Sequence, residues 1–275
     1  GGRVNGPAGV SGDYLGGSRA REGGEGIECL QPETGKRHWK YEDPVRLGSN
    51  FGTSDAPRSA PVIDGDLVFT VGVRSDLHCL NLKTGDLVWK VNLDKKYGPA
   101  PLFFGRGSCP LIDGDQLIVN VGGKFCVASF KKRTGDLIWS RVHAWHASYA
   151  SPVPATIHGK KRILVFAGGK LDPPAGGLLS LDPESGKLDD SFPWRARMFA
   201  SVNAASPVVI GNSVFVTESY TEGGALVDFA PDGSARLRWK AKRFGSQFTT
   251  PVAHDGYLYG IDGTAGTEMV CYEIA

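Results

Sequence analysis

Long apolar runs and helical hydrophobic periodicity are both scarce in this sequence. No apolar run approaches the roughly 20 residues of a membrane-spanning helix, and no signal-peptide pattern stands at the start. Few stretches repeat apolar residues every three or four positions, so a helical fold is not favoured. The 38 Gly and 17 Pro instead give the dense, regular turn signals of an all-β protein.

An excess of one charge is also lacking. The 31 Lys and Arg and the 29 Asp and Glu leave a formal net charge of +2, and the basic residues are scattered along the chain. Binding to nucleic acid or to an acidic membrane surface needs clustered basic residues, so neither partner is predicted. With 41% hydrophobic and 22% charged residues, the composition is that of an ordinary globular protein, which argues against disorder.

Cysteine is sparse, with 5 residues and no two adjacent. Cys29, Cys79 and Cys271 hold the same position in different copies of a repeat, where equivalent strands lie about 10 Å apart. Cys109 and Cys126 are expected on the first and third strands of one copy, with a strand between them. Because a disulfide needs Cα atoms within about 7 Å, we expect none and assign the cysteines to the apolar core.

The repeat itself has a period near 50 residues. A turn glycine is followed four positions later by Trp in three clean copies, with glycines Gly35, Gly85 and Gly135 and tryptophans Trp39, Trp89 and Trp139. Two looser copies have Gly186 with a delayed Trp194, and Gly233 with Trp239. A Pro-Val or Pro-Leu element forms a second landmark in each unit, at Pro61, Pro110, Pro152, Pro207 and Pro251. A period of this length is typical of solenoids and propellers.

Each unit is expected to contain four antiparallel strands. In the clearest copy they lie near residues 60–63, 66–72, 77–82 and 86–92, joined by tight turns in which glycine supplies a positive φ. Such units cannot bury their faces alone, so the sequence predicts a β-propeller in which Trp39, Trp89, Trp139 and Trp239 pack at the seams between blades.

The whole chain, residues 1–275, is predicted to be a single propeller domain. Its repeat units span residues 1–45, 59–95, 108–145, 151–195, 206–240 and 250–275. The first unit is expected to be partial, without its first strand, and the last to be partial, without its fourth.

These two landmarks and the period resemble the pyrroloquinoline-quinone (PQQ) type repeat of quinoprotein alcohol dehydrogenases. The pattern is still more similar to that of their non-enzymatic relatives, the BamB-like propellers. Propellers of this kind usually have eight blades, so the resemblance implies that the chain is an incomplete part of an eight-bladed ring.

Strand order sorts the loops of such a fold by face. Turns from first to second and from third to fourth strands share one rim and are short, whereas the connections on the other rim are long and vary in length. We expect any ligand on this long-loop rim. The candidates precede the Pro elements at the mouth of a central channel: Arg58, Arg106, Ser148, Tyr149, Asn203 and Gln247, with Phe248 beside them. Alternatively, these residues satisfy one another and channel water.

No catalytic or metal-binding residue is assigned. His143 and His146 flank Trp145, but no third ligand stands close in sequence. The resemblance implies that a quinoprotein enzyme stacks PQQ between a Trp and a vicinal disulfide, with Ca²⁺ and an Asp base nearby. This sequence has no adjacent cysteines, and neither Asp55 nor Glu218 stands in a motif that matches the base.

The resemblance therefore favours a non-catalytic BamB-like scaffold without a cofactor, located in the periplasm or otherwise outside the cytoplasm. Its partner would be a protein or a small polar ligand such as a carbohydrate. The alternative is a PQQ- and Ca²⁺-dependent alcohol or sugar dehydrogenase, and a sugar-binding or sugar-processing module is a third reading.

Overall fold

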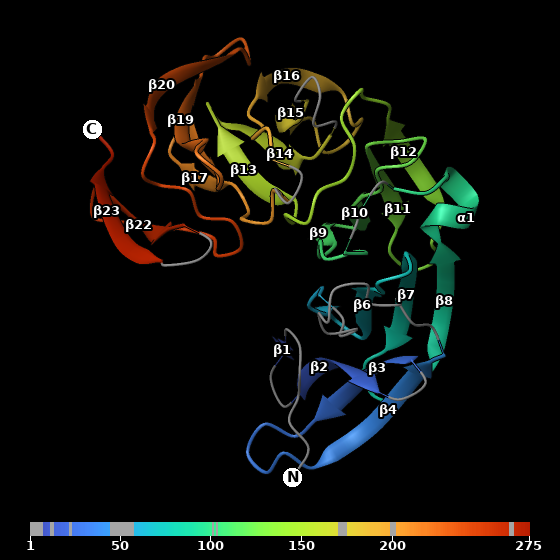
Figure 1. Cartoon of the computed structure of the whole chain (residues 1–275). Helices are drawn as coiled ribbons and strands as arrows, with labels where there is room; N and C mark the ends of the chain where they lie inside the picture. The colour runs from blue at the N-terminus through green and yellow to red at the C-terminus, as the bar shows by residue number, and fades with distance from the viewer. Residues whose placement is uncertain are drawn as a thin grey trace. The chain divides into compact units, whose positions relative to one another are not determined.

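A computed structural model describes residues 8–11, 14–21, 24–44, 58–100, 102, 104–169, 175–198, 202–263 and 267–275. The described residues form antiparallel sheets with one short helix, which confirms the all-β prediction (Figure 1). The chain divides into two compact units. Unit 1 holds residues 1–119 and 129–138, and unit 2 holds residues 120–128 and 139–275.

Each sheet consists of strands consecutive in sequence. The first contains β1 (Ala8–Ser11), β2 (Tyr14–Arg21), β3 (Gly24–Leu30) and β4 (Arg37–Asp43). The second contains β5 (Val62–Asp64), β6 (Leu67–Val71), β7 (Asp76–Asn81) and β8 (Leu87–Asn92). The third contains β9 (Leu111–Asp113), β10 (Gln116–Asn120), β11 (Val127–Lys131) and β12 (Leu137–Arg141).

The remaining sheets belong to unit 2. The fourth contains β13 (Val153–Ile157), β14 (Lys160–Ala167), β15 (Gly177–Leu181) and β16 (Leu188–Pro193). The fifth contains β17 (Val208–Ile210), β18 (Ser213–Glu218), β19 (Gly223–Phe229) and β20 (Ala235–Ala241). The sixth has three strands, β21 (Val252–His254), β22 (Tyr257–Asp262) and β23 (Glu268–Glu273).

The four strands predicted for the clearest unit match β5 to β8 to within two residues. The prediction that the first unit lacks its first strand is wrong, because β1 pairs with β2 and completes a four-stranded sheet. This strand carries no Pro-Val element, so the landmark that marks the other first strands is missing there. The spacing of the landmarks therefore does not reveal this strand.

A short helix, α1 (Leu93–Tyr97), follows β8 and was not predicted. Asn92 caps it, since its side chain accepts a hydrogen bond from the backbone N–H of Lys95 at 2.8 Å. Five residues are too few to show a helical period in sequence.

The core lies on the second and third strands of the sheets. Every residue of β6, β15 and β18 is buried, whereas the outermost strands expose side chains such as Leu87 and Val88. A bulge in the third-to-fourth strand pairing, seen in the sheets of β3, β7, β15 and β19, shifts the register before the repeat position of the tryptophan. Two consecutive outer residues therefore face solvent, and the next side chain turns toward the neighbouring sheet.

That next side chain is a tryptophan that contacts the following sheet. In unit 1 the indole N–H of Trp39 donates to the carbonyl of Leu82 at 2.7 Å, and that of Trp89 donates to Lys132 at 3.0 Å. In unit 2, Trp139 donates to Pro183 at 2.9 Å and Trp239 to Ile274 at 3.3 Å. Each acceptor lies at the end of the third strand of the next sheet, beside its turn.

The rings of Trp39, Trp89 and Trp139 lie against the turn glycine of the next sheet. A Cβ added to Gly85 would lie 2.6 Å from the ring of Trp39, and one added to Gly186 would lie 2.3 Å from Trp139. Gly135 bears the same relation to Trp89. These glycines therefore satisfy two demands together, a positive φ and room for the preceding tryptophan.

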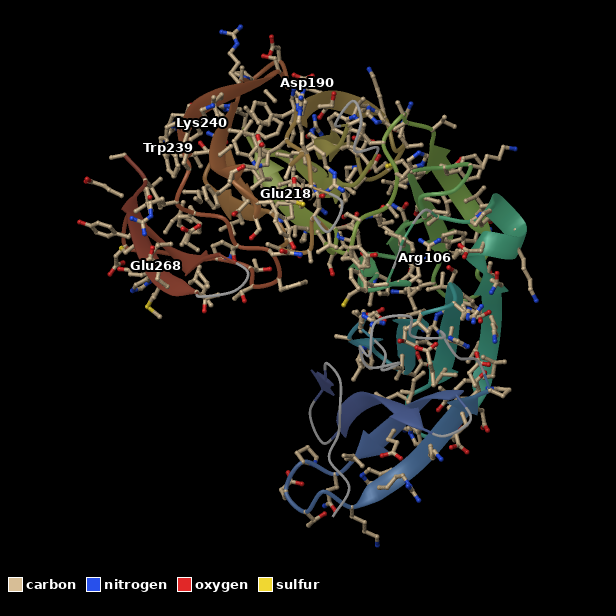
Figure 2. All side chains as sticks on the ribbon, in the orientation of Figure 1. Arg106, Asp190, Glu218, Trp239, Lys240 and Glu268 are labelled. Carbon is tan, nitrogen blue, oxygen red and sulfur yellow. The ribbon has the colours of Figure 1, made fainter. Side chains whose placement is uncertain are left out.

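One seam uses a different contact. At the position four residues after Gly186 stands Asp190, whose carboxylate accepts the backbone N–H of Ala235 at 2.7 Å, at the turn of the next sheet. The delayed Trp194 instead donates to Gly223 at 3.4 Å, at the start of β19. Figure 2 labels Asp190 and Trp239, which lie at equivalent repeat positions on β16 and β20.

A second set of bonds joins the residues that precede the repeat prolines. The backbone N–H of Ala60 donates to Cys109 Sγ at 3.0 Å. In unit 2 the N–H of Ser151 donates to Ser206 Oγ at 3.2 Å, and that of Ser206 donates to Thr250 Oγ1 at 3.0 Å. The side chain before each of these prolines thus accepts from the corresponding backbone position of the preceding sheet.

Replacement of Gly85 by Ala is expected to weaken the seam more than the same change at Gly65. Both glycines belong to the second sheet with φ of +77° and +57°, but only Gly85 faces Trp39, while nothing lies within 4 Å of a Cβ at Gly65. Gly65→Ala should cost about 1 to 2 kcal/mol of unfolding free energy from backbone strain alone, and Gly85→Ala at least about 1 kcal/mol more. Urea unfolding of both variants measures the difference, and equal losses would contradict the role given to the tryptophan.

Cys109→Ser is expected to leave stability within about 1 kcal/mol of the starting protein, because a hydroxyl serves as acceptor at the equivalent positions Ser206 and Thr250. Cys109→Ala should cost about 1 to 3 kcal/mol, since it leaves the Ala60 N–H without its acceptor. Denaturant unfolding of the two variants tests this, and a serine variant as unstable as the alanine variant would refute it.

Candidate functional site

The two candidate arginines lie in unit 1. Arg106 is only 2% exposed, and its guanidinium donates to Ser75 Oγ and to Asp94 Oδ1, each at 2.8 Å. Its burial lowers the pKa of the guanidinium, and Asp94 counteracts this. Arg106 thereby ties the β6–β7 turn to α1. Arg58 is partly exposed and acts electrostatically on Glu25.

The other four candidates lie in unit 2. Ser148, Asn203 and Gln247 are buried, and Tyr149 is partly exposed. Ser148 donates to the carbonyl of Phe166. The carbonyls of Asn203 and Gln247 accept backbone N–H groups at 2.9 and 3.1 Å. Asn203 and Gln247 therefore help to hold the innermost segments of successive sheets together.

Asn203 also touches a buried ion pair. Arg195 lies 2.6 Å from Glu218, which accepts the backbone N–H of Ala196 at 3.0 Å, and Arg195 also donates to the side-chain oxygen of Asn203. Figure 2 labels Glu218, at the end of β18. The Glu218 side chain is fully buried. Replacing either Arg195 or Glu218 alone would leave an unpaired buried charge and strongly reduce the stability of the fold.

His143 and His146 make contacts with different groups. The His143 ring packs edge-on against Trp145 at 4.7 Å, and the pKa of His143 is lowered, first by burial and then by Arg141. His146 lies 3.2 Å from the carbonyl of Gly122. Within the described ranges, no group of three or more His, Cys, Asp or Glu side chains is placed to hold a metal ion. Asp55 lies outside those ranges.

A small cavity in unit 1 brings together charged residues that the sequence did not single out. It lies between the first two sheets at the long-loop rim, and its volume of about 20 Å³ holds roughly one water molecule. Its polar lining is Glu25, Tyr41, Asp43, Thr70 and His78. Asp43 and His78 are buried, whereas Glu25 and Tyr41 keep contact with solvent.

Asp43 is the acid of this cavity whose carboxylate is paired with basic side chains. Its Oδ2 lies 2.8 Å from His78 Nε2 and accepts from Lys90 Nζ at 2.6 Å. Lys90 also lies 3.4 Å from Asp76, which accepts a hydrogen bond from Asn92 at 3.0 Å. The hydrogen bond from His78 is the main reason why the pKa of Asp43 falls to about 2, against the opposing effect of burial.

Glu25 is in the opposite situation. Its pKa is raised to about 7, mainly by burial and to a lesser extent by the carboxylates of Asp43 and Asp76, while the backbone hydrogen bond from Val73 and the charge of Arg58 oppose the rise. Both of its oxygens accept the single backbone N–H of Val73, at 2.9 and 3.0 Å. The cavity thus holds one carboxyl group that is poised to ionise near neutral pH beside another that stays ionised.

The comparison of the chain with protein families identifies its relatives. The profile of the family described as outer membrane protein assembly factor BamB matches residues 23–274. The chain belongs to the BamB family. No curated protein sequence is similar enough to count as a relative of this BamB-family chain.

Solved structures share the propeller fold. BamB from Moraxella catarrhalis is 15% identical, with a TM-score of 0.51 over 97% of this chain and 82% of that one. A quinohemoprotein alcohol dehydrogenase from Comamonas testosteroni is 12% identical, with a TM-score of 0.61 over 94% of this chain and 51% of that one. A europium-containing methanol dehydrogenase is 14% identical, with a TM-score of 0.58 over 92% and 64% of the two chains.

The BamB-family chain therefore has a β-propeller fold of PQQ-like repeats and spans about half to two thirds of these dehydrogenases. No helix within the described part of the chain is long and apolar enough to cross a membrane.

Sequence reasoning missed the cavity because its residues are ordinary charged side chains far apart in the chain. Glu25 is the second residue of β3, Asp43 ends β4, and His78 lies near the start of β7. One signal was available: a strand that starts and a strand that ends at the same rim place their terminal residues together.

The free energy of unfolding should depend on the pH through Glu25. Its folded-state pKa of about 7 lies above the ordinary 4.5, so the folded state binds the proton more tightly and loses stability as the pH rises from about 4.5 to 7. Glu25→Gln should remove that loss, which amounts to about 3 kcal/mol at most. Urea unfolding from pH 5 to 8 measures it, with Glu28→Gln on the same strand as the control. The same slope in the Glu25 variant and the starting protein would contradict the assignment.

Proposed function

We propose that this BamB-family chain is a non-catalytic scaffold that binds a protein partner through the long-loop rim. The observation that carries the proposal is the family match over residues 23–274 to an outer membrane protein assembly factor. Such a role places the chain outside the cytoplasm, where outer membrane proteins are assembled. A carbohydrate ligand has no support from these relatives.

The two rims differ in how freely they can be shaped for a partner. On the turn rim, Gly85, Gly135 and Gly186 are committed to the tryptophan seams. On the long-loop rim, the side chains of Arg58, Glu25 and Tyr41 are partly exposed beside a charged cavity. Variable, charged connections on a rigid framework are where binding residues gather in repeat proteins.

The second candidate is a quinoprotein dehydrogenase, favoured by the similarity to the alcohol dehydrogenase structures. The groups expected to stack on PQQ do not fit this reading. Trp145 is only 9% exposed and packs against His143, and the cysteines lie on separate segments. We therefore favour partner binding over a dehydrogenase activity for this chain.

Two titrations separate the candidates. In the first, an outer membrane β-barrel protein is diluted from urea into buffer with the chain, and fluorescence anisotropy reports binding. In the second, PQQ with Ca²⁺ is added, and alcohol-dependent dye reduction is followed. We expect saturable binding in the first and no dye reduction in the second. Dye reduction that depends on PQQ, or no binding of the unfolded barrel, would overturn the proposal.

A further inference from the structure

One buried nitrogen that belongs to the lining of the unit 1 cavity has no hydrogen-bond partner. His78 lines it, its side chain is 3% exposed, and its Nδ1 has no partner, while Nε2 lies 2.8 Å from Asp43. When Nε2 carries the proton and donates it to Asp43, Nδ1 is a buried acceptor. Buried polar atoms are almost always paired, so the geometry calls for a donor in the cavity.

Glu25 presents a second acceptor in the same cavity. A carboxylate has about four acceptor positions, whereas one backbone N–H, that of Val73, serves both oxygens of Glu25. A Cβ on Gly72 would lie 2.5 Å from Glu25 Oε2, so the backbone already lies close against that oxygen.

The charges around the cavity are unequal. The carboxylates of Glu25, Asp43 and Asp76 come from β3, β4 and β7. Lys90 on β8 pairs with Asp43 and Asp76, and Arg58 acts on Glu25 from the segment before β5. With His78 neutral and Glu25 ionised, as it is above pH 7, three carboxylates face two cations, which leaves one negative charge in excess.

The size of the cavity restricts what can enter. About 20 Å³ holds a group of the size of a water molecule, which an ammonium head matches and a planar guanidinium with five N–H donors exceeds. An ammonium has three donors for Glu25, His78 and a further acceptor. The partly exposed ring of Tyr41 adds a surface that attracts cations.

We propose that this cavity binds a primary ammonium group, the Nζ of a lysine side chain presented by a polypeptide partner. The proposal rests on the scaffold function only for the source of the lysine. A water molecule would supply donors without cancelling the excess charge, and it is the competing occupant in the test.

The probe is N-α-acetyl-lysine methylamide, titrated into isotopically labelled protein while the amide signals of Gly72, Val73 and His78 are followed by NMR. We expect saturable shifts of these signals, with a dissociation constant on the order of 1 to 10 mM. The N-ε-acetylated analogue and the arginine analogue should give none. No saturable shift with the lysine probe, or equal shifts with all three probes, would overturn the proposal in favour of water.

Glu25→Gln should abolish the response, whereas Glu28→Gln, on the same strand, should keep it. A variant that fails to fold does not decide the matter, because the starting protein alone carries a second test. Because the pKa of Glu25 is about 7, its carboxylate is protonated as the pH falls from 8 to 6. The affinity of the starting protein for the lysine probe should therefore fall about tenfold over this range. An affinity that does not change over this range would contradict the ammonium site.

The failure of this proposal is distinguishable from that of the scaffold function. The small probe reports on the cavity alone, and the unfolded barrel protein reports on partner binding. Binding of the barrel without binding of the probe would leave the scaffold function standing and remove the lysine site.

Discussion

The contact between a tryptophan of one sheet and the turn glycine of the next is the interaction on which the rest of the structure depends. A single sheet of four short strands buries only part of its faces, so it needs a neighbour. Where a tryptophan stands at the seam, its indole gives the seam a large apolar area and one directed hydrogen bond, as Trp39 and Trp139 show. The bulge before the tryptophan and the absence of a side chain on the glycine both serve this contact.

The seam also accounts for the division of labour between the rims. Because the turn rim is occupied by the tryptophan contacts, its sequence is held to Thr-Gly or Ser-Gly in most copies. On the opposite rim, the charged groups of the described residues differ from sheet to sheet. Examples are the Arg106–Asp94 pair, the Arg195–Glu218 pair and the acidic cavity. We regard this rim as the face at which function is added to the framework.

The repeat made the strands predictable, since each landmark marks one turn and one strand start. It failed where a copy departs from the pattern. β1 has no Pro-Val element, and Asp190 stands where the other copies have tryptophan, so neither could be read from the spacing. The cavity was missed for another reason. The pairing of Asp43 with His78 joins residues 35 positions apart across two sheets, and no local pattern encodes such a contact.

Hydrogen exchange of the tryptophan indole N–H groups tests the seam most directly. If the indoles of Trp39, Trp89 and Trp139 donate to the next sheet, their N–H signals should exchange with deuterium only on the time scale of opening of the seams, far more slowly than those of the unfolded chain. Exchange of these three indoles as fast as in the urea-unfolded protein, under conditions where the strand amides of β6 and β14 stay protected, would contradict the account.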